Sequence, residues 1–146
     1  MELSKQMLFD WCAAHSEEQL TLLSELAALP APSNHEEQRV AFIQNWLKEQ
    51  GATNSYVDRA GNVLLPFGCD GRDKILVFMA HTDIVFPDQG RLPVHEEDGK
   101  LYAPGVGDDT ANVVGLMMCA KFLLTNKLTP KDPVLLVFNT GEEGLG

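Results

Sequence analysis

Two short apolar runs, with a long apolar helix pattern between them, limit the fold of this chain most strongly. The runs are Ile75 to Ala80 and Val134 to Phe138, and neither contains a charged residue. Uninterrupted apolar runs of this length are typical of strands that are buried on both faces. Residues 110–126 are largely apolar over a length that is typical of a buried helix. Strand, helix and strand in this order predict a βαβ element. We therefore predict the α/β class, with a mixed, mostly parallel sheet flanked by helices.

The N-terminal third of the chain is predicted to be helical. Residues 3–14 and 17–28 keep a helical period, and a stretch with two prolines then interrupts it. A third helix follows, for which Ser33 and Glu36 have the spacing of a capping box. Gly51 comes directly after its apolar stripe and is predicted to be its C-terminal cap.

Shorter strands are predicted on either side of the first apolar run. Tyr56 to Asp58 and Asn62 to Phe67 have strand-like composition, and Pro66 places the second of them at an edge or an end of the sheet. Between residues 93 and 103, the step Asp98-Gly99 predicts a β-hairpin turn.

The composition excludes several classes of partner. The 146 residues include 11 basic and 21 acidic side chains, for a net charge of −10. Nucleic acids and anionic membranes both require a basic surface, so neither is expected as a partner. Cys12, Cys69 and Cys119 form no CxxC motif, which argues against a disulfide framework or a thiolate zinc site. The N-terminus has no apolar signal region and no run is long enough for a membrane span, so we expect a cytoplasmic protein.

Three acidic motifs occur where chemistry is expected. The first motif, His81-Thr82-Asp83, follows the first apolar run, and the second motif, Asp108-Asp109, follows a glycine-rich turn. The third motif, Glu142-Glu143, follows the second apolar run. Ligands of open α/β sheets bind outside the carboxyl ends of the strands. The imidazole and the carboxylates are therefore expected to converge on one site, as in a metal centre with a catalytic base.

Each motif also has a simpler interpretation when it is taken alone. His81 could be a structural histidine, although Asp83 lies two residues away and could set its tautomer. The acidic pair at 108–109 could be a solvated helix start, although two adjacent carboxylates are easier to hold together beside a cation. A dinucleotide loop is rejected because Thr110 replaces the third glycine of GxGxxG. Glu142-Glu143 could be a solvated turn, or one acid could bind metal while the other moves a proton.

Taken together, the motifs resemble those of a known family. The chain is similar to the M20 family of co-catalytic zinc peptidases and deacylases, which includes tripeptidase- and carboxypeptidase-like enzymes. The resemblance begins at Ala31-Pro32-Ser33, includes the run of residues 58–63 (DRAGNV), and ends with HTD, GDD and GEEG in order. Thr110 departs from the lysine that is frequent in the family, and Ala111 from a common glycine.

The resemblance implies a role for each motif residue. His81 would bind one zinc ion, Asp108 would bridge two, and Glu143 would bind the second. Glu142 would be the general base, and Asp83 would orient His81. The peptide bond between Asp108 and the next residue would be cis. The complete site would hold two Zn²⁺ ions, for which Co²⁺ or Mn²⁺ could substitute.

The family also has parts for which residues 1–146 provide no counterpart. Its members continue with another acidic ligand, a lid-like dimerisation domain and a late histidine ligand. His15, His35 and His95 do not stand at motif positions. We therefore expect residues 1–146 to be the N-terminal part of the catalytic domain of a longer parent enzyme, for which a homodimer is one expected form.

Three functional hypotheses follow. In the first, the parent is an aminopeptidase- or tripeptidase-like hydrolase of a peptide or an N-acyl amino acid. In the second, the 146-residue chain is a non-catalytic metal-binding or fold module, because each ion would have two protein ligands where catalytic zinc usually has three. Weak metal binding and no useful activity are then expected of this chain. The third, a glycosidase-like carboxylate pair, has no role for His81.

Overall fold

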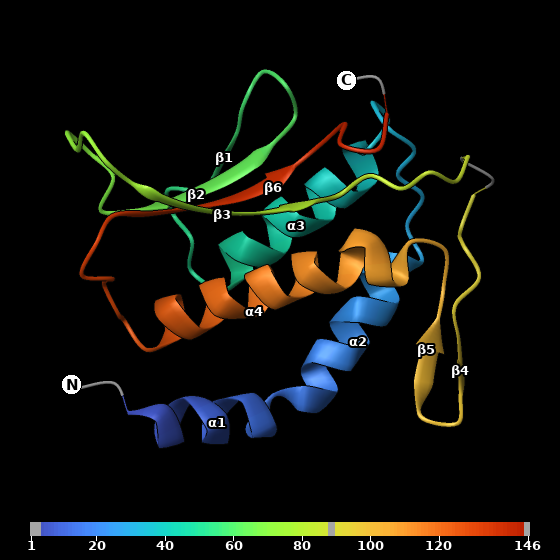
Figure 1. The fold of residues 1–146 in the computed structure, drawn as a ribbon, viewed down its shortest axis with the longest axis horizontal. Helices are drawn as coiled ribbons and strands as arrows, with labels where there is room; N and C mark the ends of the chain where they lie inside the picture. Colours follow the sequence, from blue (N-terminus) through green and yellow to red (C-terminus); the bar gives the residue numbers. More distant parts are fainter. Residues whose placement is uncertain (1–3, 88–89, 145–146) are drawn as a thin grey trace.

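The computed structural model describes residues 4–87 and 90–144 as one layer of helices under a β-sheet, with a separate hairpin (Figure 1). In chain order the elements are α1 (Lys5–Ala14), α2 (Ser16–Ala27), α3 (Glu37–Glu49), β1 (Tyr56–Val57), β2 (Val63–Phe67), β3 (Leu76–His81), β4 (His95–Glu97), β5 (Lys100–Tyr102), a short irregular helical segment η1 (Val106–Thr110), α4 (Ala111–Thr125) and β6 (Val134–Asn139).

The main sheet confirms the predicted α/β class and the βαβ element. Its strand order is β1-β2-β6-β3. Strands β3 and β6 are parallel neighbours, and α4 lies in the connection between them. The other two pairings, β1 with β2 and β2 with β6, are antiparallel. The sheet is therefore mixed as predicted, but within the described residues it is not mostly parallel. The reason is that β2 follows β1 through a tight turn and then pairs antiparallel with β6.

The hydrophobic core lies between the sheet and the helices. Helices α3 and α4 run under one face of the sheet, and α2 packs beneath α4 (Figure 1). The core is built from aliphatic side chains of both layers, among them Leu26, Ile43, Leu47, Val63, Leu65, Val113, Val114, Met117, Leu136 and Phe138. The backbone pairing of β3 with β6, which ends at His81 and Asn139, places the ends of both strands side by side.

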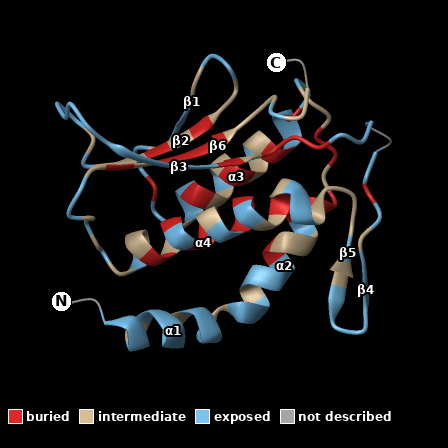
Figure 2. Cartoon of the chain, in the orientation of Figure 1, coloured by how far each residue is buried: buried red, intermediate tan, exposed pale blue. Residues whose placement is uncertain are grey.

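One prediction for the sheet is wrong. Strand β6 is largely buried, as its apolar run predicts, but β3 is not buried on both faces. Leu76, Val77, Phe78 and Met79 are between 49% and 61% exposed (Figure 2). Within the described residues, β3 pairs with β6 alone, and no helix lies on the outer face of the sheet. Apolar composition indicates that a strand belongs to a sheet, but it does not tell which neighbours cover it.

The remaining predicted elements are present with small shifts. The hairpin β4–β5 turns at Asp98 and Gly99, whose φ angles of 51° and 69° are those of a two-residue turn with two left-handed positions. Gly51 follows α3 with φ 95° and donates its N–H to the carbonyl of Lys48 at 2.9 Å, as expected of a C-terminal cap. In the described part of the chain, no helix is both long and apolar enough to span a membrane.

Candidate metal centre

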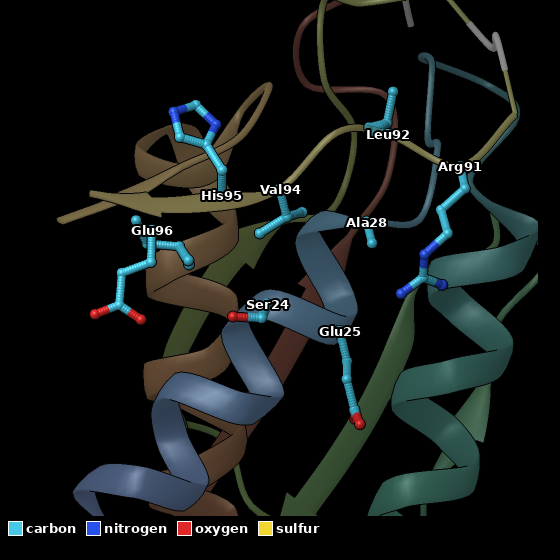
Figure 3. Close-up of a pocket in the computed structure, with 9 residues that line it drawn as sticks. Ser24, Glu25, Ala28, Arg91, Leu92, Val94, His95 and Glu96 are labelled. Atoms are coloured by element: carbon cyan, nitrogen blue, oxygen red, sulfur yellow. The ribbon is translucent and has the colours of Figure 1, made fainter. Parts of the chain in front are cut away.

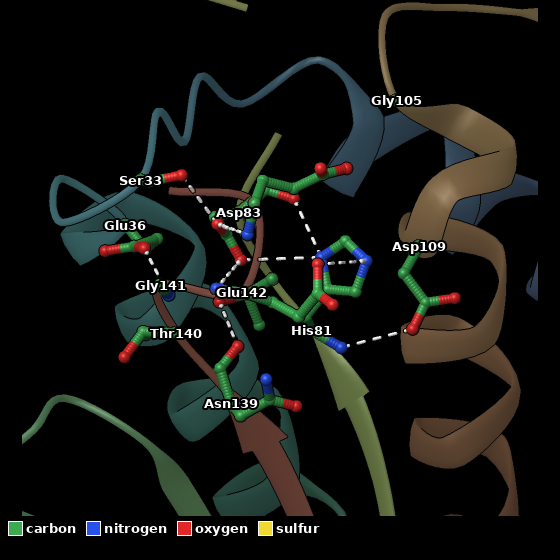
Figure 4. A network of polar contacts seen from close by, with 12 residues as sticks. Ser33, Glu36, His81, Asp83, Gly105, Asp109, Asn139, Thr140, Gly141 and Glu142 are labelled. Atoms are coloured by element: carbon green, nitrogen blue, oxygen red, sulfur yellow. Dashed lines mark hydrogen bonds and ion pairs between the residues drawn. The ribbon is translucent and has the colours of Figure 1, made fainter. Parts of the chain in front are cut away.

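The three motifs meet at the carboxyl ends of β3 and β6. His81 is the last residue of β3 and pairs in register with Asn139, the last residue of β6. The loop of residues 141–144, called the GEEG loop below, therefore begins beside His81 (Figure 4). Segment η1 directly precedes α4 and brings Asp108 and Asp109 within hydrogen-bonding distance of His81. The predicted convergence of the motifs is thus present in the fold.

The imidazole of His81 lies between two sets of carboxylates. Its Nδ1 is 3.2 Å from the carbonyl oxygen of Asp83 and 3.4 Å from that residue's Oδ1. Its Nε2 is 3.2 Å from Oδ1 of Asp108 and 3.8 Å from Oε2 of Glu142. A proton on Nδ1 can be donated to Asp83, which leaves the lone pair of Nε2 directed toward Asp108 and Glu142.

The acidic surroundings change the proton affinity of His81. Burial by itself would lower the pKa of the imidazole. The hydrogen bond to Asp108 and the charges of Asp109 and Asp83 outweigh burial, so the pKa of His81 is raised above its ordinary value of 6.5. The carboxylates around the imidazole therefore favour its protonated form.

Asp83 organises the GEEG loop as well as facing His81. Its carboxylate is completely buried. It accepts hydrogen bonds from the Ser33 hydroxyl at 2.7 Å, from the Glu142 N–H at 3.0 Å and from the Glu143 N–H at 2.8 Å. Burial would raise the pKa of Asp83, but these hydrogen bonds outweigh it and the pKa is lowered. The sequence suggested only the contact of Asp83 with the imidazole and gave no signal for its role in the loop.

The predicted capping box at Ser33 and Glu36 is wrong. Helix α3 begins at Glu37 with no side-chain cap. Ser33 donates to Asp83 instead, and the buried Glu36 carboxylate accepts from the N–H groups of Asn34 and Gly141, both at 2.9 Å. Because both side chains bond to residues distant in sequence, the local capping pattern is replaced by a tertiary one. Neither was predicted as a site residue.

A second set of hydrogen bonds connects the start of the GEEG loop to the turn between β1 and β2. Asn62 accepts the N–H of Thr140 at 2.9 Å, and the Thr140 hydroxyl donates to the carbonyl of Ala60 at 2.9 Å. Asp58 holds this turn through hydrogen bonds from Ala60 and Asn62. The segment of residues 58–63, which carries part of the family resemblance, therefore supports the third motif.

Segment η1 presents the second motif with an irregular backbone. The peptide bond between Asp108 and Asp109 is cis, as the resemblance implied. Asp109 accepts the N–H of His81 at 3.1 Å through Oδ2, and its Oδ1 accepts from the side-chain amide of Asn112. The Asp108 side chain is instead 82% exposed. One aspartate of the pair is thus held against β3, and the other is accessible.

Gly105 allows η1 to approach the first motif closely. Its φ is 66°, and a Cβ atom at this position would lie 2.3 Å from Cγ2 of Ile84. We expect Gly105→Ala to lower the free energy of unfolding by about 2–4 kcal/mol, because strain at positive φ and overpacking add. Urea denaturation of both proteins measures the difference. Gly107→Ala is the matched control, since its added Cβ meets nothing within 4 Å. An equal effect of the two substitutions would contradict this account.

Two of the three predicted ligands, Asp108 and Glu143, border one cleft. The possible ligand atoms form two groups, and within each group all atoms lie within 4.8 Å of one another. One group is His81 with Glu142 and Glu143, and the other is His81 with Asp108 and Asp109. Asp108 and Glu143 belong to different groups, but both line an open cleft of about 470 Å³. Val85, Phe86 and Val106 are the main apolar residues of its wall. Imidazole nitrogen and carboxylate oxygen are ligands that zinc accepts.

The other histidines lie away from these groups, as their sequence positions suggested. His15 stacks on Trp11 with ring centroids 4.0 Å apart, and His35 is exposed. His95 lies beside a separate hollow of about 370 Å³ between α2 and the β4–β5 hairpin, together with Glu25 and Arg91 (Figure 3).

Comparisons with known proteins find a matching family model and related sequences. Residues 77–146 match the model of peptidase family M20/M25/M40. The cytosol non-specific dipeptidase of Escherichia coli is 32% identical over 99 residues, which cover 65% of this chain and 18% of the dipeptidase. An uncharacterised metallohydrolase of Methanocaldococcus jannaschii is 30% identical over 108 residues, which cover 69% of this chain and 26% of that protein.

The fold matches solved structures as well. Human carnosine dipeptidase 1 superimposes with a TM-score of 0.76 at 20% identity, over 97% of this chain and 35% of that one. The chain thus spans about a quarter or less of the length of these two curated relatives and about a third of this structure. The family model, the relatives and the fold agree that this chain is similar to members of peptidase family M20/M25/M40.

Proposed function

We propose that this chain supplies the metal-binding motifs of an M20-type hydrolase that cleaves a peptide or N-acyl amide bond with two zinc ions and a glutamate base. One observation carries the proposal. Nε2 of His81 lies 3.2 Å from Asp108 and 3.8 Å from Glu142, although the three residues come from three separate segments. The match to the family model supports the hydrolase class, and the similarity to the metallohydrolase of M. jannaschii supports a divalent metal.

The donor set fits zinc. His81 would contribute its Nε2 atom to one ion, Asp108 would bridge the two ions, and Glu143 would contribute to the second. The position of Asp83 beside Nδ1 supports a tautomer in which Nε2 is free to bind metal. When bound, the ions would polarise the substrate carbonyl and acidify water.

The proposed catalytic role of the chain's own residues is proton transfer by Glu142. Glu142 would accept a proton from the attacking water and donate it to the leaving amine nitrogen as the amide bond breaks. Its side chain is 56% exposed, so water and substrate can reach it. Its backbone N–H is fixed by Asp83, which keeps the start of the side chain in one place beside His81. Asp83 would thereby position both the imidazole and the base.

The substrate and the setting are proposed from the relatives. The E. coli relative is a dipeptidase, so short peptides are the first substrates to test, followed by N-acyl amino acids. The same name places that relative in the cytosol, and we propose a cytoplasmic location here. Because the chain spans 18–26% of the curated relatives, we propose that activity requires a longer parent enzyme, with a homodimer as one form to test.

Zinc titration of the metal-free chain tests the proposed centre. We expect Zn²⁺ to bind with a dissociation constant weaker than micromolar, because each ion would have two of the assigned ligands where catalytic zinc usually has three. His81→Ala should remove this binding, since both groups of ligand atoms share His81. Isothermal titration calorimetry measures the affinity and the stoichiometry.

The matched control is His35→Ala, which removes an exposed imidazole that belongs to neither group of ligand atoms. It should bind zinc as the unchanged chain does. Loss of binding in both variants, or in neither, would contradict the assignment of His81. Submicromolar binding of two ions per chain would show that the ligand count is wrong.

A further inference from the structure

A buried arginine connects the segments that carry the three motifs. Arg39 comes from α3 and is completely buried. Its Nε donates to the carbonyl of Leu29 at 3.0 Å, and its Nη1 donates to the carbonyl of Thr82 at 3.0 Å and to the hydroxyl of Thr110 at 2.9 Å. Its Nη2 is buried without a hydrogen-bond partner among the described residues. A charged group held inside the fold in this way calls for an explanation.

The two acceptors on Nη1 belong to different motifs. Thr82 stands between His81 and Asp83, and Thr110 directly follows the aspartate pair. The Thr110 hydroxyl accepts from Arg39 and itself donates to the carbonyl of Gly105 at 2.7 Å. One nitrogen atom therefore fixes the first motif and both ends of the second motif relative to each other.

The third motif is attached through the same threonine. Both the N–H and the hydroxyl of Thr82 donate to the carbonyl of Asn139, at 2.8 Å and 2.9 Å. Asn139 ends β6 and precedes the GEEG loop. Arg39 thus donates directly to the first motif and to the residue that follows the second, and it is connected to the third through Thr82. It makes no hydrogen bond to the proposed metal ligands.

We propose that Arg39 is a positioning residue of the metal centre, whose guanidinium fixes the spacing between the His81 and Asp108 segments and so sets the affinity for divalent metal. This inference rests on the proposed function in one respect, that the centre binds metal. Arginine suits the role because its planar fork donates in several fixed directions, whereas lysine offers one flexible point charge.

A positioning role and a purely electrostatic role of Arg39 predict different changes in zinc affinity when the residue is replaced. Burial lowers the pKa of Arg39 to about 10, while the charge of Asp83 opposes the shift, so the group is cationic at pH 7. A buried cation near the centre repels metal ions. If its charge dominated, Arg39→Met would strengthen zinc binding and Arg39→Lys would leave it unchanged. If its hydrogen bonds dominate, both variants bind zinc more weakly.

The experiment compares the zinc affinity of the unchanged chain, Arg39→Lys and Arg39→Met by competition with a chromophoric chelator. Affinity is measured at a temperature at which circular dichroism shows each protein to be folded. We expect about a tenfold loss in both variants, the size usual for residues that orient ligands. The visible absorption bands of bound Co²⁺ should also change, because they report the ligand geometry. Arg72→Lys is the matched control, as Arg72 is exposed.

A second pair of variants keeps the test decisive if Arg39 variants do not fold. Thr110→Val removes the hydroxyl that Arg39 contacts, whereas Thr110→Ser keeps it. Only Thr110→Val should weaken zinc binding. Unchanged affinity and unchanged Co²⁺ bands in folded Arg39→Lys or in Thr110→Val would overturn the positioning role while the proposed function stands. Absence of metal binding by the unchanged chain would instead overturn the proposed function.

Discussion

Glu142→Gln is expected to reduce turnover by the parent enzyme by about a thousandfold or more while zinc stoichiometry stays the same. The amide keeps the shape of the side chain but cannot accept a proton from water, and general acid–base groups contribute about 10²–10⁴ in rate. Glu142 is not one of the proposed metal ligands, so the ions should remain. The measurement pairs steady-state kinetics on a dipeptide substrate with metal analysis of the purified protein.

Glu49→Gln provides the matched control for this prediction. Glu49 is an exposed glutamate at the end of α3, and its replacement should leave turnover within a factor of two of the unchanged enzyme. If Glu142→Gln kept comparable turnover, Glu142 would not be the base. If turnover and zinc were lost together, Glu142 would be a ligand.

Asp83→Ala is expected to cause the largest loss of stability among the site residues, about 3 kcal/mol in the free energy of unfolding. The substitution removes one acceptor for the N–H groups of Glu142 and Glu143 and for the Ser33 hydroxyl. Donors left unpaired inside a protein destabilise it by about 1–3 kcal/mol each. Because the GEEG loop and His81 both lose their support, zinc affinity should also fall more than tenfold. Urea denaturation and zinc titration measure the two effects.

The pKa of Asp83 determines the pH at which the stabilities of Asp83→Ala and the unchanged chain should be compared. Because it is lowered in the folded chain, the stabilisation by the carboxylate is complete above the ordinary pKa of 3.8 and is lost as the pH falls through the lowered value. Measurements at pH 7 therefore report the full effect. Ser33→Ala is the control, since it removes one of the three hydrogen bonds and should destabilise by about 1 kcal/mol. A smaller loss in Asp83→Ala than in Ser33→Ala would contradict this account.

Much of the fold could be predicted because local patterns determine local structure. The long, largely apolar run of residues 110–126 predicted α4, and the Asp98-Gly99 step predicted the β4–β5 hairpin. The error for β3 has a different origin. Its composition marks a strand, yet exposure depends on which elements cover each face, and that information lies in other parts of the sequence.

Some residues of the candidate site could be predicted from the sequence, and others could not. Residues with reactive side chains at strand ends, such as His81 and Glu142, stand out in the sequence because their chemistry is unusual in those places. Ser33, Glu36 and Arg39 do not stand out. Ser33 and Glu36 have the spacing of a helix cap, and Arg39 has the appearance of a surface residue on a helix, until the fold places them against the motifs.

The sequence by itself determined the α/β class, the βαβ element and the chemical nature of the three motifs, because these depend on residue type and on spacing along the chain. Only the tertiary structure decided that Asp83 holds the GEEG loop and that Arg39 contacts both Thr82 and Thr110. The physical reason is that these contacts join residues 43 to 71 positions apart, and buried polar groups take the partners that packing brings within hydrogen-bonding distance.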